Sequence, residues 1–384
     1  MSRPIYLDCN ATTPVAPQVL EAMLPFFTDY FGNPSSLNHS YGWEAEAAVK
    51  AARESLAEAI NADPVEIVFT SGATEANNLA IKGVAESYMA HGKHIITVQT
   101  EHSAVLDPCR YLETLGFSVT YLSVQKDGLI DLVALEDAFQ PETILVSVMA
   151  ANNEIGVLQP IQEIGQLCHD REVIFHTDAA QALGKIPLDV QAMNIDLLSM
   201  TAHKLYGPKG IGALYVRRRN PRVQLAPQLH GGGQERGLRS GTLYTPQIVG
   251  FGEAVRLAIT SQATDSERLR GLRDRLWQKL SALPGIHLNG HPTQRLPNNL
   301  NVSIEGVKGS ALLSKVQSEI AVSSGSACSS ANPAPSHVVK ALGRSDEIAR
   351  ATLRFGLGRE TTQEEIDRAV ETVINGVAAV RSSV

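Results

Sequence analysis

Residues 66–88 read EIVFTSGATEANNLAIKGVAESY, and this stretch decides the fold. Its first part, Glu66–Thr70, is rich in β-forming side chains and predicts a short buried strand. Ser71-Gly72 then predicts a tight turn, and Ala73–Tyr88 has the length of a helix. The stretch is therefore one strand–turn–helix unit.

The same unit recurs toward the C-terminus as far as about residue 216. Further strands are predicted at His94–Val98, Ser118–Val124, Thr143–Ala150, Val173–Thr177, Leu197–Thr201 and Ile211–Val216. Helix-length segments lie between most of them, at Ser103–Leu115, Leu132–Phe139 and Ile161–Arg171. Apolar strands that alternate with helices indicate an α/β protein with a mainly parallel, seven-stranded sheet covered on both faces. In such a sheet the ligand site lies at the carboxyl ends of the strands.

The pattern changes after about residue 260. Ser266–Leu283 is predicted to be a charged amphipathic helix, and short strands and helices mix from there through Thr361–Val380. We therefore expect a large domain at residues 16–260 and a smaller α+β domain formed by residues 1–15 and 261–384.

Composition places the chain among ordinary globular proteins. Of its 384 residues 43% are hydrophobic and 19% are charged, and the formal net charge is −7. A negative chain is a poor general nucleic-acid binder, and the basic cluster Arg217–Arg222 is interpreted as a solvated turn after a strand. No apolar run approaches the roughly 20 residues of a membrane helix. We expect neither nucleic acid nor membrane as a direct partner.

The cysteines and the first residues indicate the compartment. Cys9, Cys109, Cys168 and Cys328 are widely spaced and form no CxxC pair, as is usual in a reduced compartment. No Cys/His spacing resembles a metal site. The N-terminal residues lack the apolar core of a signal peptide. The expectation is a cytoplasmic protein without a metal.

Four chemically distinctive segments follow directly on predicted strands. The turn Ser71–Glu75 is either a phosphate-binding helix N-terminus or an ordinary helix cap. His102 is either a helix-start residue or a functional imidazole. Asp178 is costly to bury unless it is paired, and it is either a helix cap or the partner of a protonated pyridine. Lys204 ends an apolar strand, where a desolvated amine would be nucleophilic. Placed together at one sheet edge, these groups predict a pyridoxal-phosphate (PLP) site.

A further feature lies far along the chain, at residues 323–330. This segment reads SSGSACSS and presents a single thiol, Cys328, among small and polar residues. Such a composition suits a mobile loop that carries a nucleophile to a substrate. The alternative is an inert thiol in a turn.

Taken in order, these motifs resemble the cysteine desulfurases of the class V (fold type I) PLP aminotransferase superfamily. The resemblance covers nearly the whole chain and rests on YLD at 6–8, ATTP at 11–14, FGNPSS at 31–36, SGATE at 71–75, TEH at 100–102, NNEIG at 152–156, HTDAAQ at 176–181, SMTAHK at 199–204, RSGT at 239–242, SSGSAC at 323–328 and RF at 354–355. The SSGSAC segment resembles the long-loop branch, which supplies sulfur for iron–sulfur clusters and thiolated nucleosides.

The resemblance implies a role for each matched residue around the cofactor. Lys204 would bind PLP as a Schiff base and shuttle protons at the substrate α-carbon. His102 would stack on the pyridine ring and act as an acid–base group, and Asp178 would pair with the ring nitrogen. Gln181 and Asn153 would hydrogen-bond around the phenolic oxygen of the cofactor and the substrate. The phosphate would be held by Ala73, Thr74, Thr201, His203 and, from the other subunit of a homodimer, Thr242.

The resemblance also implies how the substrate is handled. Arg354 would clamp the carboxylate of L-cysteine with its planar guanidinium. The Cys328 thiolate would attack the substrate sulfur, releasing alanine and leaving a persulfide for an acceptor such as an iron–sulfur scaffold protein. The alternative is a PLP-dependent cysteine or selenocysteine lyase of the same fold, which would not need Cys328 for sulfur. The other three cysteines are expected to be buried bystanders.

Overall fold

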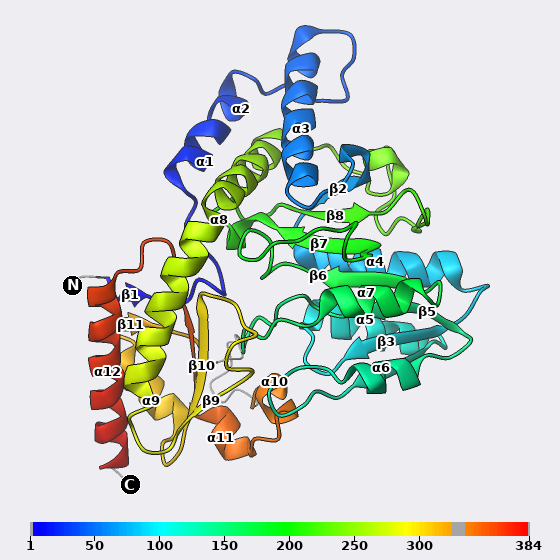
Figure 1. Cartoon of the computed structure of the whole chain (residues 1–384). Coiled ribbons are helices and arrows are strands. Elements are labelled where there is room, and N and C mark those ends of the chain that lie inside the picture. The colour runs from blue at the N-terminus through cyan, green and yellow to red at the C-terminus, as the bar shows by residue number, and fades with distance from the viewer. Residues whose placement is uncertain (1–2, 325–334, 383–384) are drawn as a thin grey trace.

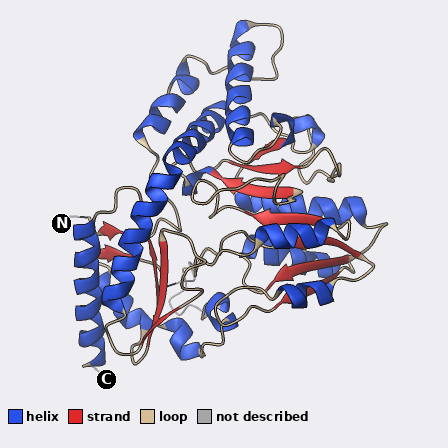
Figure 2. Ribbon diagram, viewed as in Figure 1, coloured by secondary structure: helices blue, strands red, loops and turns tan. Residues whose placement is uncertain are grey.

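The computed structural model describes residues 3–324 and 335–382. Its centre is a seven-stranded sheet made of β2 (Ile67–Thr70), β3 (His94–Val98), β4 (Ser118–Leu122), β5 (Thr143–Ser147), β6 (Ile174–Asp178), β7 (Leu197–Thr201) and β8 (Gly212–Val216). The strand order is β2-β8-β7-β6-β5-β3-β4, and only β8 runs antiparallel to its neighbours. The predicted α/β class and mainly parallel sheet are therefore confirmed (Figures 1 and 2).

Strand β5 ends earlier than the sequence predicts. The apolar run continues to Ala150, but the ladder ends at Ser147. Beyond Ser147 the amides of Val148 and Ala150 still donate to β6, whereas the Met149 amide donates to the Glu101 carboxylate. Met149 and Ala151 line the cavity described below.

Both faces of the sheet are buried, which explains the continuous apolar runs. Successive side chains of a strand point to opposite faces, and accordingly Ile95 and Ile96 belong to different hydrophobic clusters. One face carries α4 (Ala73–Tyr88) and α5 (Ser103–Thr114). The other face packs against elements that include α1 (Pro17–Met23), α3 (Ser40–Glu58), α6 (Leu132–Ala138), α7 (Ile161–His169) and the first part of α8 (Thr245–Leu280).

Helix α8 is 36 residues long and corrects the sequence prediction of a helix that begins at Ser266. Its first half contributes Phe251 and Val255 to the core of the central sheet, and its second half contributes Leu276 to a separate core. The polar stretch before Ser266 contains neither Gly nor Pro, so nothing interrupts the helix there. The predicted domain boundary between residues 260 and 261 falls inside this continuous helix.

The second core belongs to a smaller α/β layer beside the central sheet (Figure 1). It contains the antiparallel sheet β12-β10-β9 and the parallel pair β1-β11. Ile5 and Leu7 from the start of the chain join this core. The elements of this core are β1 (Ile5–Tyr6), β9 (Ile286–Leu288), β10 (Asn299–Ile304), α9 (Gly309–Val316), β11 (Ile320–Ala321), β12 (Thr352–Gly356) and α12 (Gln363–Arg381). Two short helices, α10 (His337–Ala341) and α11 (Asp346–Arg350), pack in a further small cluster with Ile155 and Val157. The short helix α2 (Pro25–Thr28) follows α1.

Candidate active site

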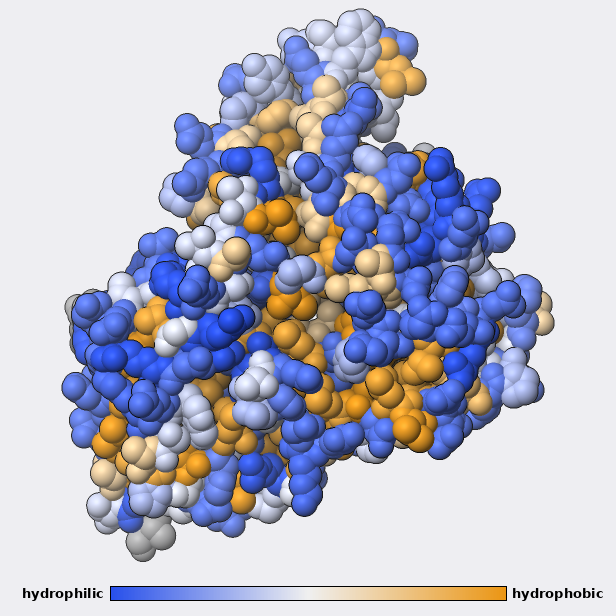
Figure 3. All heavy atoms as spheres, in the orientation of Figure 1, coloured by the Kyte–Doolittle hydropathy of each residue, from blue (hydrophilic) through white to orange (hydrophobic). Residues whose placement is uncertain are grey.

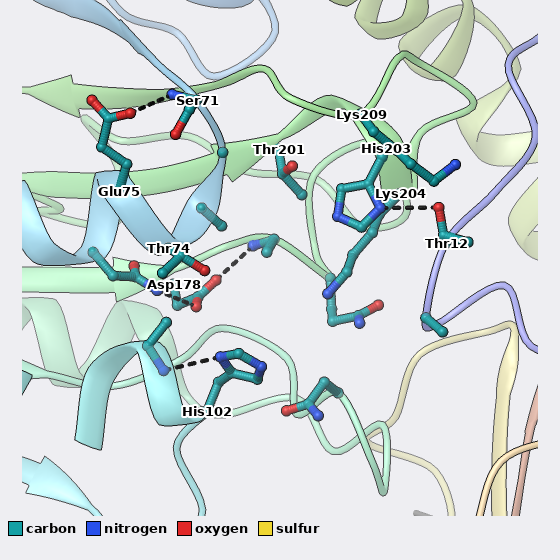
Figure 4. A pocket seen from close by; sticks show the side chains of 18 of the residues that line it. Thr12, Ser71, Thr74, Glu75, His102, Asp178, Thr201, His203, Lys204 and Lys209 are labelled. Carbon is teal, nitrogen blue, oxygen red and sulfur yellow. Dashed lines mark hydrogen bonds between the residues drawn. The ribbon is translucent and has the colours of Figure 1, made fainter. Parts of the chain in front are cut away.

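A cavity of about 460 Å³ opens where β2, β3, β6 and β7 end. Nine residues that the sequence predicts for the cofactor line it: Ala73, Thr74, His102, Asn153, Asp178, Gln181, Thr201, His203 and Lys204. They come from five separate segments, and Figure 4 shows many of them facing one another across the cavity. The carboxyl ends of parallel strands share one sheet edge, which explains why these segments meet.

Lys204 follows β7 on a single 3-10 turn, Ala202–Lys204. Burial lowers the pKa of its amine to about 8, and the Arg354 guanidinium acts in the same direction while the Asp178 carboxylate opposes both. An amine with this pKa is uncharged in an appreciable fraction of molecules near neutral pH. Lys204 is therefore able to act as a nucleophile and as a base.

Asp178 is the last residue of β6, and two neutral donors hold its carboxylate. The Ala180 amide donates to Oδ1 at 2.9 Å, and Nδ2 of the fully buried Asn77 donates to Oδ2 at 2.7 Å. Neither donor neutralises the negative charge. The buried carboxylate therefore remains available to a positively charged partner in the cavity.

His102 lies both at the start of a helix and at the cavity wall. It is the N-cap of α5, where its Nδ1 accepts the Ala104 amide at 3.1 Å, and it also lines the cavity. An accepting Nδ1 places the proton of the neutral ring on Nε2. Burial, the leading cause, lowers the pKa of the ring. A neutral imidazole with fixed orientation therefore faces the cavity (Figure 4).

The opposite end of the cavity is suited to an anion. Helix α4 begins after Gly72 without a side-chain cap, so the amides of its first turn have no side-chain acceptor. Glu75 does not occupy them, because its carboxylate binds the Ser71 amide and pairs with Arg239 at 2.7 Å. The amides of this turn are therefore free to bind a phosphate, as the phosphate-site interpretation requires.

His203 faces the same end of the cavity. Its Nδ1 lies 3.1 Å from the Thr12 hydroxyl. Burial and, after it, the nearby lysine charges lower the pKa of this ring to about 4. The imidazole is therefore neutral at physiological pH, and Thr201 and Lys209 complete this wall.

Gln181 and Asn153 form the wall between the two ends. The Gln181 amide donates to the Asn10 carbonyl at 2.8 Å and accepts from the Lys185 amine at 3.2 Å. The side-chain oxygen of Asn153 is buried and has no hydrogen-bond partner among the described residues. A hydrogen-bond donor on a bound ligand would satisfy this buried acceptor.

Arg354 lies on β12 and is buried behind this wall, outside the residues that line the cavity. Its Nη2 pairs with Asp8 at 2.8 Å and its Nη1 donates to the Asn153 carbonyl at 3.1 Å. Nε is buried without a hydrogen-bond partner in the described chain. The guanidinium therefore supports the cavity wall, and its Nε–H donor is unused among the described residues.

Besides Arg354, one further predicted site residue that the structure describes does not line the cavity of this chain. Thr242 is exposed and does not line it. Cys328 lies outside the described residues, so only the flanking residues can be placed. On one side Ser323 pairs with the backbone of Arg354, and on the other Ser336 hydrogen-bonds to Glu154, the neighbour of Asn153. Both flanks thus reach the cavity wall.

The remaining cysteines are buried. Burial, the leading cause in each case, raises the pKa of Cys9 to about 11 and of Cys109 to about 12, and raises that of Cys168 further. Thiols of this kind are poor nucleophiles near neutral pH.

The sequence reasoning missed several residues that shape the site. Asn77 and Asn10 hold the predicted residues Asp178 and Gln181. Glu101 is fully buried, its pKa is raised well above the usual range by burial, and its Oε1 accepts the Met149 amide. Asn77 stands one helical turn beyond the Ser71–Glu75 motif on a helix-length segment, which is the signal that could have identified it.

Comparison with known proteins agrees with this geometry. Residues 5–369 match the family "Aminotransferase class-V". The chain is 56% identical over 381 residues to "Cysteine desulfurase IscS" of Methylococcus capsulatus, covering 99% of this chain and 94% of that protein. It is 56% identical over 380 residues to "Cysteine desulfurase" of Rattus norvegicus, covering 99% and 84%.

Solved structures give the same result. The structure titled "NIFS-LIKE PROTEIN" has a TM-score of 0.91 and 37% identity, covering 98% of this chain and all of that one (100%). The structure titled "SspA in complex with cysteine" has a TM-score of 0.80 and 42% identity, covering 92% and 98%. The chain belongs to the aminotransferase class V family and, within it, to the cysteine desulfurases.

Proposed function

We propose that this protein is a PLP-dependent cysteine desulfurase that converts L-cysteine to L-alanine and transfers the sulfur atom to Cys328. The observation that carries the proposal is that Lys204, the Asp178 carboxylate and an uncapped helix N-terminus line one cavity. Such an arrangement recognises three groups: the helix N-terminus binds a phosphate, the lysine binds a reactive carbonyl, and the carboxylate binds a basic ring nitrogen.

The residues of the cavity fit PLP from end to end. Ala73 and Thr74 would hold its phosphate with Thr201 and His203, and Asp178 would hold the ring nitrogen. The side-chain oxygen of Asn153, which has no partner among the described residues, would accept a hydrogen bond from the substrate or the cofactor. Once bound, the cofactor would supply an electron-withdrawing ring that stabilises negative charge on the substrate α-carbon.

The side chains of this chain would provide the proton handling and the orientation. Lys204, with a pKa near 8, would move a proton to or from the α-carbon. The neutral ring of His102 would present its Nε2–H group to the cavity. The unused donor of Arg354 would attract the substrate carboxylate.

Cys328 would take the sulfur. Its thiolate would form an S–S bond with the substrate sulfur as the Cβ–S bond of L-cysteine breaks, and the carbon fragment would gain a proton to become alanine. The balance is one thiol and one cysteine giving one persulfide and one alanine. Ser323 and Ser336, which flank the segment that carries Cys328, are both anchored at the cavity wall.

The persulfide would then pass to acceptor proteins. The relative from Methylococcus capsulatus bears the name "Cysteine desulfurase IscS". For this chain we infer the task of sulfur supply for iron–sulfur cluster assembly, tRNA thiolation or both, by a cytoplasmic homodimer. No helix within residues 3–324 and 335–382 is long and apolar enough to cross a membrane.

The cofactor assignment is tested by absorbance. The purified protein loaded with PLP should show a band at about 400 nm, typical of a lysine-bound cofactor, and Lys204→Ala should lack it. Lys209→Ala is the matched control, because Lys209 also lines the cavity but is solvent-exposed. A wild-type protein that takes up no PLP would contradict the proposal.

The sulfur-transfer assignment is tested separately at residue 328. Mass spectrometry of cysteine-treated protein should find about 32 Da added at Cys328, the mass of one sulfur atom. In Cys328→Ala the turnover of L-cysteine should collapse, whereas Cys9→Ala, which alters a buried thiol, should retain it. Turnover of cysteine that survives in Cys328→Ala would favour a cysteine or selenocysteine lyase.

A further inference from the structure

Asn77 is the buried polar residue that the proposed reaction leaves unexplained. It lies on α4 with no exposed surface, and it lines the cavity beside Asp178. Its Nδ2 donates to Asp178 Oδ2 at 2.7 Å, a short hydrogen bond inside the protein. A carboxylate oxygen only accepts, so the amide must turn its NH2 group toward Asp178. The orientation of this side chain is therefore fixed by chemistry.

The second oxygen of Asp178 has a different kind of support. It accepts the amide of Ala180, which belongs to the same chain segment and moves with it. Asn77 comes from another element, on the helix that packs across the sheet. Among the described residues it is the side chain that ties the Asp178 carboxylate to the rest of the site.

We propose that Asn77 is a positioning residue that sets the rotamer of Asp178 and holds it as a carboxylate for the protonated ring nitrogen of the cofactor. The inference rests on the proposed function, because it gives Asp178 that partner. A hydrogen bond donated to a carboxylate stabilises its charged form. An amide does this without adding charge, whereas a lysine or arginine at the same place would compete with the cofactor for the carboxylate.

The location of Asn77 on α4 adds a second consequence. The amides of Ala73 and Thr74 stand at the start of this helix, and Asn77 stands one turn further on the side that lines the same cavity. A helix rises about 1.5 Å per residue and is stiff over one turn. One rigid element thus fixes both the phosphate end of the cavity and the carboxylate at its ring end.

The experiment compares Asn77→Ala and Asn77→Leu with Asn78→Ala. Asn78 is the matched control because it is the next residue of the same helix, and its side chain donates to the Thr74 carbonyl of that helix. Loss of a hydrogen bond to a charged group should weaken PLP binding by about 10- to 100-fold in both Asn77 variants. Asn78→Ala should bind PLP like the wild type. The leucine variant keeps the branched shape and the heavy-atom count of the Asn77 side chain and guards against a cavity effect on folding.

A pH titration of the bound cofactor's absorbance gives the second readout. The titrating proton is the one on the nitrogen that would join Lys204 to the cofactor. A ring nitrogen that holds its own proton less firmly leaves less positive charge on the ring, so the proton at the Lys204 nitrogen is lost less readily and its pH midpoint should move upward in both Asn77 variants. A purely structural role would change thermal stability without moving this midpoint. Wild-type affinity and midpoint in Asn77→Leu would overturn the inference while leaving the proposed function intact. Failure of the wild type to bind PLP would instead overturn the proposed function.

Discussion

At the scale of single residues, the candidate site combines ionisable side chains that are buried away from water with hydrogen-bond donors that stabilise the buried carboxylate. Lys204 loses hydration and its pKa falls to about 8. His203 and His102 lose theirs and become neutral rings, with pKa values lowered by burial. Asp178 keeps neutral donors on both oxygens. Burial thus favours the neutral forms of Lys204, His102 and His203 that their proposed tasks need.

The lowered pKa of Lys204 has a direct kinetic consequence. At pH 7.5 about a quarter of amines with a pKa of 8 are uncharged, against about one in a thousand for an ordinary lysine. Because only the uncharged amine attacks a carbonyl, the rate at which cofactor-free protein captures PLP should rise with pH and level off above about pH 8. Stopped-flow absorbance measures this rate. A rate that still rises steeply at pH 10 would show that the amine is unperturbed.

Arg354 offers a second prediction at this scale. Arg354→Ala removes the predicted substrate clamp and leaves Asp8 without its ion-pair partner. The loss of a bidentate charge-assisted contact should raise the barrier measured by kcat/KM for L-cysteine by about 2–5 kcal/mol. Arg354→Lys should recover only part of it, because an ammonium lacks the planar fork.

The control for this prediction is another arginine in the same small layer. Arg275→Ala breaks an ion pair with Asp367 between α8 and α12, and neither residue lines the cavity. It should leave kcat/KM unchanged. Equal kinetics for wild type and Arg354→Ala would mean that the substrate carboxylate is held elsewhere.

At the scale of elements, α8 is the helix that connects the two hydrophobic cores. Its two halves bury side chains in different cores, and Figure 1 shows it running from the central sheet to the smaller layer. Where α8 crosses α3, the backbones come close at Gly252. A Cβ atom built there would lie 2.8 Å from both Cα and Cβ of Ala52. The contact therefore requires a residue without a side chain.

Two glycines on this helix provide a matched pair of substitutions. Gly252→Ala should lower the free energy of unfolding by about 1–3 kcal/mol, because the added methyl group must displace α3. Gly271→Ala, on an exposed part of the same helix with nothing within 4 Å, should raise it by about 0.5–1 kcal/mol. Denaturant unfolding measures both. Equal effects of the two substitutions would contradict the close approach of α3 and α8.

At the scale of the whole molecule, one region of the surface carries more apolar side chains than a lone globular protein needs. Large apolar residues are exposed on or near α1, α2 and α3, namely Leu20, Leu24, Phe27, Tyr30, Phe31, Leu37, Tyr41, Trp43 and Tyr244. Apolar atoms interrupt the hydrophilic surface in that part of Figure 3. Tyr244 lies two residues from Thr242, which is expected to reach the cavity of a second subunit. These observations support a homodimer through this face.

The dimer is tested by its mass and by mixing subunits. Trp43→Glu places a charge on the apolar face, so light scattering should show monomers where the wild type forms dimers. The monomer should also bind PLP more weakly than the wild type, since it lacks the Thr242 hydroxyl of a second subunit. Lys50→Glu, on an exposed position of the same helix α3, should leave the dimer intact. A wild type that is monomeric at all concentrations would contradict the proposal.

Much of the molecule could be predicted from sequence. Seven apolar segments alternating with helices require a doubly covered sheet, and β3, β7 and α4 have the predicted bounds. Because parallel strands present their carboxyl ends together, the same pattern placed Lys204, Asp178 and His102 at one edge. The family predicted from the motifs is confirmed by full-length relatives. The long-loop subtype and the role of Cys328 stay predictions.

The amino-acid order by itself thus determined which side chains could do chemistry and on which elements they stand, since strand and helix periodicities are local properties of the chain. Only the tertiary structure decided which partners those side chains have. Asn77 meets Asp178 across 101 residues, and Arg354 meets Asp8 across 346. No local pattern specifies such contacts, because they depend on how separate elements pack, and packing also sets the burial that lowers the pKa of Lys204.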